Sequence, residues 1–99
     1  MRKYAFLLMG EEYTPARHQA KFETDVITSH IFTVNSPQEA KTLVKKLYEE
    51  GFGAIEVCGA FGPELTKELI EISNNEIAFG YSVGFDSQKE LSHKFWTGA

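Results

Sequence analysis

Four side chains in this sequence have the chemistry for proton transfer or nucleophilic attack: Glu56, Cys58, His30 and His18. Glu56 and Cys58 belong to the stretch GAIEVCGAFGPE, residues 53–64, which holds the only cysteine of the chain. A carboxylate or an imidazole can act as a general base, and a thiol beside an imidazole can act as a nucleophile. Such pairs work only when the side chains meet in space, so the elements that hold them decide their chemistry.

Glu56 and Cys58 lie on a predicted strand, Ala54 to Cys58, where side-chain alternation places both on one face. A further predicted strand, Ile77 to Phe85, alternates bulky residues with Ala, Gly and Ser, so Ser82 belongs to its bare face. We therefore expect a polar recess in which Glu56 and Cys58 stand over small residues. A carboxylate in an interior strand loses hydration and needs a cation, hydrogen-bond donors, water or a ligand.

Structural roles for the same residues stay open. Small residues also let a helix pack closely, and Glu56 could then bind a backbone amide or a neighbouring subunit. Cys58 could be a small buried hydrophobic residue, because a reactive thiol needs a base nearby. His30 supplies that base, or joins Glu56, only if the strand Val26 to Val34 turns it to the same face, which depends on the pairing register.

The turn after Cys58 leads into a helix, where backbone amides can hold a carboxylate or a phosphate. The glycines of this turn, Gly59 and Gly62, are equally well explained by a tight reversal of the chain. Their spacing matches neither a dinucleotide-binding fingerprint nor a P-loop. A ligand at this end of the sheet would meet the following candidate binding residues: Gly59, Ala60, Phe61, Gly62, Ser82 and Glu11.

His18 lies in the long segment EEYTPARHQAKFETD, residues 11–25, which shows neither helical nor strand periodicity. A loop of this length can serve as a lid that carries a proton-transferring imidazole, although an exposed loop histidine is commonly only solvated. The histidines and Glu56 lack the spacing of metal ligands, such as two histidines one helical turn apart, so no metal site is expected. Nothing in the sequence specifies a cofactor.

The elements that position these residues alternate along the chain. Ser36, Pro37 and Glu39 form a capping box that starts a helix ending at Gly51, and Ser87 with Glu90 suggests a second box before the last helix. The predicted order is strand, long loop, strand, helix, strand, helix, strand, helix. This order predicts one α/β domain over residues 1–99, with a small, mostly parallel four-stranded sheet and both middle helices on one face.

The composition limits the classes of partner that this 99-residue chain can bind. Of its residues, 42% are hydrophobic and 24% are charged. A formal net charge of −4 argues against nucleic acid, and no apolar run approaches the ~20 residues needed to span a bilayer. A single cysteine suits the reducing cytoplasm. The small core, together with an unclaimed sheet face, suggests a homo-oligomer.

The stretches YAFLLMG, PARH, SHIFTV and GAIEVCGAFG together resemble a family of small bacterial proteins of unknown function. The resemblance covers nearly the whole chain, and GAIEVCGAFG is its most specific part. It implies a soluble bacterial single-domain protein and brings no established activity, cofactor or catalytic residue.

The sequence therefore favours a small-molecule-binding α/β protein for a polar or anionic metabolite. If it is an enzyme, the available residues suit proton transfer with Glu56 or a histidine as the base. The alternative is a non-enzymatic homo-oligomeric scaffold or interaction module, in which the bare sheet face packs against a second copy. An open concavity lined by these groups favours the first function, and a flush symmetric interface favours the second.

Overall fold

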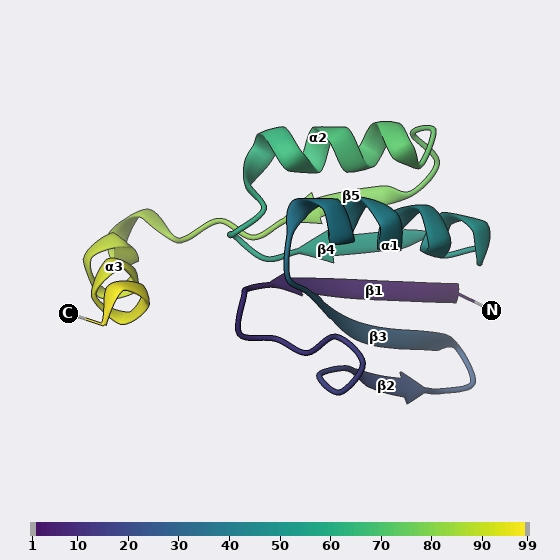
Figure 1. The fold of residues 1–99 in the computed structure, drawn as a ribbon, viewed down its shortest axis with the longest axis horizontal. Helices are drawn as coiled ribbons and strands as arrows, with labels where there is room; N and C mark the ends of the chain where they lie inside the picture. Colours follow the sequence, from purple (N-terminus) through teal and green to yellow (C-terminus); the bar gives the residue numbers. More distant parts are fainter. Residues whose placement is uncertain (1, 99) are drawn as a thin grey trace.

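A computed structural model describes residues 2–98 and shows one five-stranded sheet with two helices, α1 (Pro37–Glu49) and α2 (Gly62–Ile72), on the same face (Figure 1). The strands are β1 (Arg2–Met9), β2 (Ala20–Glu23), β3 (Ile27–Val34), β4 (Ala54–Val57) and β5 (Ala78–Tyr81). Their order in the sheet is β2-β3-β1-β4-β5, and only β2 runs antiparallel to its neighbour. The predicted α/β class and the mostly parallel sheet are confirmed.

The strand β2 was missed by the sequence prediction, which treated residues 11–25 as a loop. It pairs with β3 as the outer strand of a hairpin, and the Thr24 hydroxyl closes the turn by accepting hydrogen bonds from the backbone amides of Val26 and Ile27. All four of its residues are exposed. The strand therefore has no buried face, and its alternation of apolar and polar residues is too short to identify a strand from sequence. The sheet therefore has five strands rather than the four expected.

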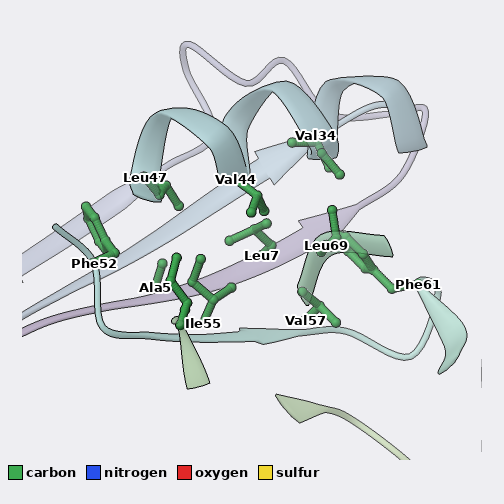
Figure 2. Close-up of a cluster of buried hydrophobic side chains, with 12 residues drawn as sticks. Ala5, Leu7, Val34, Val44, Leu47, Phe52, Ile55, Val57, Phe61 and Leu69 are labelled. Carbon is green, nitrogen blue, oxygen red and sulfur yellow. The ribbon is translucent and has the colours of Figure 1, made fainter. Parts of the chain in front are cut away.

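The core lies between the sheet and the helices α1 (Pro37–Glu49) and α2 (Gly62–Ile72). Ala5 and Leu7 of β1 are fully buried there, and so are Ile55 and Val57 of β4, because alternation turns these positions toward the helices. Figure 2 shows these side chains meeting those of the helices and the neighbouring segments. The other buried hydrophobic residues are Val34, Ala40, Val44, Leu47, Phe52, Phe61, Leu69 and Ile77.

Helix α1 begins with the predicted capping residues, but the hydrogen bond that the Glu39 side chain accepts differs from that of a capping box. Ser36 Oγ accepts a hydrogen bond from the Glu39 amide at 3.2 Å, as a capping box requires. The Glu39 carboxylate, however, accepts from the amide of Asn35 at 2.7 Å instead of from that of Ser36. Gly51 follows the helix with φ +87°, a left-handed conformation that favours glycine, which confirms the predicted stop.

The C-terminal region departs from the prediction. Strand β5 ends at Tyr81, and an extended segment then leads to a 3-10 turn, η1 (Asp86–Gln88), and to α3 (Lys89–Thr97). Neither η1 nor α3 has a side-chain cap, so the predicted Ser87–Glu90 capping box is wrong. Helix α3 projects from the end of the sheet (Figure 1), and every residue from 81 to 98 is exposed.

The second sheet face carries no helix among residues 2–98, and we call it the open face (Figure 1). Pairing registers and strand alternation assign the residues of this face. They are Tyr4, Phe6 and Leu8 of β1, Ala20 and Phe22 of β2, Ser29, Ile31 and Thr33 of β3, Ala54 and Glu56 of β4, and Ala78 and Gly80 of β5. None of the helices described between residues 2 and 98 has the length and apolar character needed to cross a bilayer.

Candidate ligand-binding cleft

A cleft of about 810 Å³ lies on the helix-covered side of the sheet, where β3 and β2 extend beyond α1. Helix α1 leads from β3 across β1 to β4, so it leaves the outer part of β3 and the whole of β2 uncovered. The cleft is bordered by β2, β3, α1 and the segment that follows α1. Its volume falls within the range of about 300 to 1,000 Å³ that is typical of small-molecule sites.

His30 lines this cleft and is fixed on two sides. Its ring stacks on Phe32, with centroids 3.7 Å apart and planes at 13°. Its Nε2 lies 2.8 Å from the side-chain oxygen of Gln19, the residue just before β2. Phe52 meets Phe32 edge-on at 6.2 Å, so the imidazole sits beside an apolar aromatic floor.

The environment of His30 sets its protonation. An amide oxygen only accepts hydrogen bonds, so the contact with Gln19 assigns the proton to Nε2 and makes Nδ1 the acceptor nitrogen. Desolvation lowers the pKa of His30, and the positive charge of Lys21 on the adjacent strand lowers it further, against the opposing effect of Glu50. The imidazole is therefore neutral at pH 7, with Nδ1 able to accept a proton or a hydrogen bond.

Charged side chains surround the cleft. Lys3, Lys21 and Lys46 contribute ammonium groups to its lining, which also contains glutamates. Lys3 Nζ donates to the backbone oxygen of Glu50 at 2.9 Å and lies 5.8 Å from the centre of the Phe52 ring. The ion pairs around these lysines are long, with Lys46 Nζ 4.0 Å from a Glu50 carboxylate oxygen. Such exposed pairs are weak, so the lysines can bind an anion instead.

Glu56 is not in this cleft, and the convergence of Glu56 with His30, which depended on the register, does not occur. Register pairs His30 with Ala5 and Glu56 with Phe6, and consecutive residues of β1 point to opposite faces. Glu56 is on the open face and is exposed, so the anticipated loss of hydration does not arise. Tyr4 Oη donates a hydrogen bond to its carboxylate at 2.5 Å. Burial, followed by this bond and the charge of Glu56, raises the pKa of Tyr4 to about 12.

Cys58 is also remote from His30. Ala5 pairs with both His30 and Ile55, so Cys58 lies two strands away and three residues farther along. At ~3.3 Å per residue and ~4.8 Å per strand, the two backbones are about 14 Å apart. The Cys58 thiol instead accepts a hydrogen bond from the Met9 amide at 3.5 Å. His30 therefore cannot act as its base.

The turn that follows Cys58 reaches the end of the sheet as predicted, but its residues face different surroundings. Gly59 and Ala60 are exposed, whereas the Phe61 side chain is buried in the core and Gly62 opens α2 with φ +68°. The remaining binding candidates, Ser82 and Glu11, are exposed beyond β5 and β1 respectively, and the Ser82 amide donates to the Val57 carbonyl. None of these candidates lines the His30 cleft.

His18 lies on the other side of the sheet, in a smaller hollow of about 420 Å³ beside Leu8, Tyr13 and Ile31. Its Nδ1 accepts a hydrogen bond from the Thr14 amide at 2.8 Å, which closes a local turn. The loop folds against β3, where the Thr33 hydroxyl donates to the His18 carbonyl. The histidine is therefore part of an ordered loop on the open-face side and does not meet His30.

Sequence reasoning did not identify Gln19, Lys3 and Phe52 as residues of the cleft that His30 lines. The missing information was the strand β2, because its pairing places Lys21 opposite His30 and brings the preceding Gln19 to the imidazole. The only local signal for this strand was the alternation of polar and apolar residues from Lys21 to Glu23, which is short and exposed.

The fold and the cleft define a small α/β protein with a parallel sheet covered on one face and a histidine-centred cavity at its β2–β3 side. By sequence the chain belongs to a family of unknown function, DUF6506, whose pattern matches residues 2–97. Neither the curated proteins nor the solved structures contain a significant match to this chain.

Proposed function

We propose that this protein binds a small organic acid in the His30 cleft. The carrying observation is a neutral imidazole that Gln19 orients and Phe32 stacks against, inside a cleft of about 810 Å³ whose lining includes three lysines and three glutamates. A ligand with a flat carbon skeleton matches the aromatic floor, and a carboxylate matches the ammonium groups. This is the class of polar or anionic metabolite that the candidate residues of the sequence suggested, but at a different site.

Each part of the cleft has a separate role in recognition. His30 Nδ1 accepts a hydrogen bond from a hydroxyl or amine of the ligand, which fixes the ligand's orientation. Lys21 and Lys46 attract its carboxylate from opposite walls, since one is on β2 and the other is on α1. Phe52 covers the apolar part of the ligand.

The same arrangement suits proton transfer if the bound acid is turned over. His30 Nδ1 would take a proton from the ligand, leaving an imidazolium on the protein and a negative charge on the ligand. Lys21 or Lys46 would stabilise that negative charge. Gln19 would hold the ring in the required tautomer, because its amide oxygen accepts the Nε2 proton. We place this function in the bacterial cytoplasm, which the lone cysteine supports.

A ligand screen tests the proposal. Carboxylic, hydroxy and aromatic acids are added to the protein, compounds that raise its melting temperature are selected, and their affinities are measured by calorimetry. His30→Phe keeps a flat ring over Phe32 and removes both nitrogens, while His93→Phe makes the same change in the exposed helix α3. We expect at least one acid to bind the wild type and the His93 variant alike, and to bind the His30 variant about tenfold more weakly.

Two results would overturn the proposal. One is that no acid in the set stabilises the wild-type protein. The other is that the selected acid binds His30→Phe with unchanged affinity, since the imidazole nitrogens would then take no part in recognition.

A further inference from the structure

Helix α3 exposes its apolar side chains. Phe85, Phe95 and Trp96 are 78%, 73% and 79% exposed, and Val83 and Leu91 are also largely in solvent. Leu91 and Phe95 lie one helical turn apart, and Phe95 meets Trp96 edge-on at 4.9 Å, so these side chains form a continuous apolar surface. We call residues 82–98 the arm. A monomer with this arm in water exposes more apolar surface than soluble monomers usually do.

The open face of the sheet is the second uncovered apolar surface. Phe6, Leu8 and Ile31 lie on it on adjacent strands and are half-buried, with Leu8 and Ile31 beside the loop of His18, and Phe22 extends it to β2 with 62% of its surface exposed. Sheets built from parallel strands normally have both faces covered. The chain therefore contains an uncovered sheet face and an apolar helix without a partner, which are complementary surfaces.

We infer that the protein forms a homodimer in which the arm of each copy docks on the open face of the other. The path of the arm favours a second copy as the occupant. The segment after β5 is extended, with φ −73° and ψ 134° at Phe85, and it carries α3 away from its own sheet (Figure 1). A reciprocal exchange has twofold symmetry, so it closes the assembly at two copies. This inference does not depend on the ligand proposal, since the His30 cleft is on the opposite face.

Shape and charge are consistent with this docking. The open face of β4 and β5 carries Ala54, Ala78 and Gly80, which leave room for bulky side chains of an incoming helix. Glu56 stands among these small residues, and α3 carries Lys94 directly beside Phe95. A docked arm can thus place an ammonium group near a carboxylate that Tyr4 already bonds.

The area available is sufficient for a stable dimer. If the five large side chains of the arm each lose ~100 Å² to the partner, one arm buries roughly 500 Å². The sheet face beneath it loses a similar area, so two reciprocal contacts bury roughly 2,000 Å². Stable protein interfaces of standard size bury about 1,200 to 2,000 Å².

Light scattering at micromolar concentration gives the mass directly. We expect the wild type to have twice the 11.2 kDa of the single chain. Truncation after residue 84 removes the apolar helix, and Phe95→Asp places a charge on its apolar side, so both variants should be monomers. Thr97→Asp is the matched control, because it adds the same charge to the opposite side of α3, and it should remain a dimer.

A mixing experiment separates exchange between copies from an arm that folds back on its own sheet. Gly80→Arg blocks the receiving face without disturbing the fold, because an added Cβ meets only the Glu56 side chain at 3.7 Å. Alone, Gly80→Arg and Phe95→Asp should each be monomeric. Mixed at a higher concentration, they should form a weaker mixed dimer, since the intact arm of the first binds the intact face of the second in a single contact of roughly 1,000 Å².

Three results would overturn the inference. They are a monomeric wild type, a dimer that survives both truncation and Phe95→Asp, and a mixture of the two variants that stays monomeric. Circular dichroism of each variant confirms that the sheet and helices are folded, which we expect because the arm packs on none of the core residues.

Discussion

Replacing Glu56 by Gln tests the hydrogen bond that links β1 and β4 on the open face. Tyr4 is opposite Ala54, so Glu56 is its diagonal neighbour on the adjacent strand, within reach of a tyrosine hydroxyl. The phenol donates to the carboxylate at 2.5 Å. The substitution keeps the size of the side chain and removes its charge, so it removes both the charge-assisted bond and the repulsion that a phenolate would meet.

The size of the effect follows from the pKa of Tyr4, which is raised from 10.0 to about 12. Burial is the largest cause, followed by the hydrogen bond to Glu56 and by the negative charge of Glu56. The folded protein therefore holds this proton more tightly than the unfolded chain does. The resulting stability is present below pH 10 and is lost as pH rises through 12. Because the pair is largely solvated, we expect Glu56→Gln to lower the free energy of unfolding at pH 7 by only ~1 kcal/mol.

Spectroscopic titration of the phenolate measures the pKa, and the difference between the wild type and Tyr4→Phe isolates Tyr4 from the other tyrosines. Glu56→Gln should lower the pKa of Tyr4 while leaving part of the shift that burial causes. Glu76→Gln is the control, because its carboxylate contacts Tyr48 at 3.2 Å instead. A wild-type Tyr4 that titrates at 10, or a pKa that Glu56→Gln leaves unchanged, would refute this reasoning.

Three further predictions concern the rest of the molecule. His30 has a lowered pKa, so the stability that its neutral form contributes is present above pH 6.5 and is lost on acidification; denaturant melts should show a smaller loss between pH 7 and 5 in His30→Phe. Leu69 is fully buried, so Leu69→Ala should lower the free energy of unfolding by about 2 to 5 kcal/mol in urea melts, and a loss below 1 would contradict the packing. The Asn35 side-chain amide donates to Gly10 and Tyr13 carbonyls at 3.1 and 2.5 Å, so Asn35→Ala should speed amide exchange in residues 11–19 but not in α2.

Strong local signals made most of the fold predictable from sequence. A continuous apolar run such as Tyr4 to Met9 is typical of a central strand, and the capping box at Ser36 with Gly51 bounded a helix, because each signal rests on local chemistry. The last helix was predicted and is present as α3, but neither its projection from the sheet nor the strand β2 could be predicted in the same way. Strand β2 has no buried face, so burial imposes no long alternation on its sequence, and the apolar side of α3 does not reveal that it meets no core of its own chain.

The candidate site was less predictable because it depends on register. A shift of one residue between β1 and β3 would turn His30 to the opposite face. Alternation within β4 correctly put Glu56 on the side away from Ile55, but it could not say that this side stays open to water. Gln19 became a neighbour of His30 only through pairing between strands, which no local pattern reveals.

The central claim is that His30 contacts a bound organic acid, and nuclear magnetic resonance of the histidine side chains tests it most directly. Imidazole nitrogen and carbon signals are followed while the acid that most raises the melting temperature is added. We expect the His30 signals to shift and to saturate with the occupancy measured by calorimetry, while those of His18 and His93 stay in place. Signals of His30 that do not move at full occupancy, with shifts at His18 or His93 instead, would contradict it.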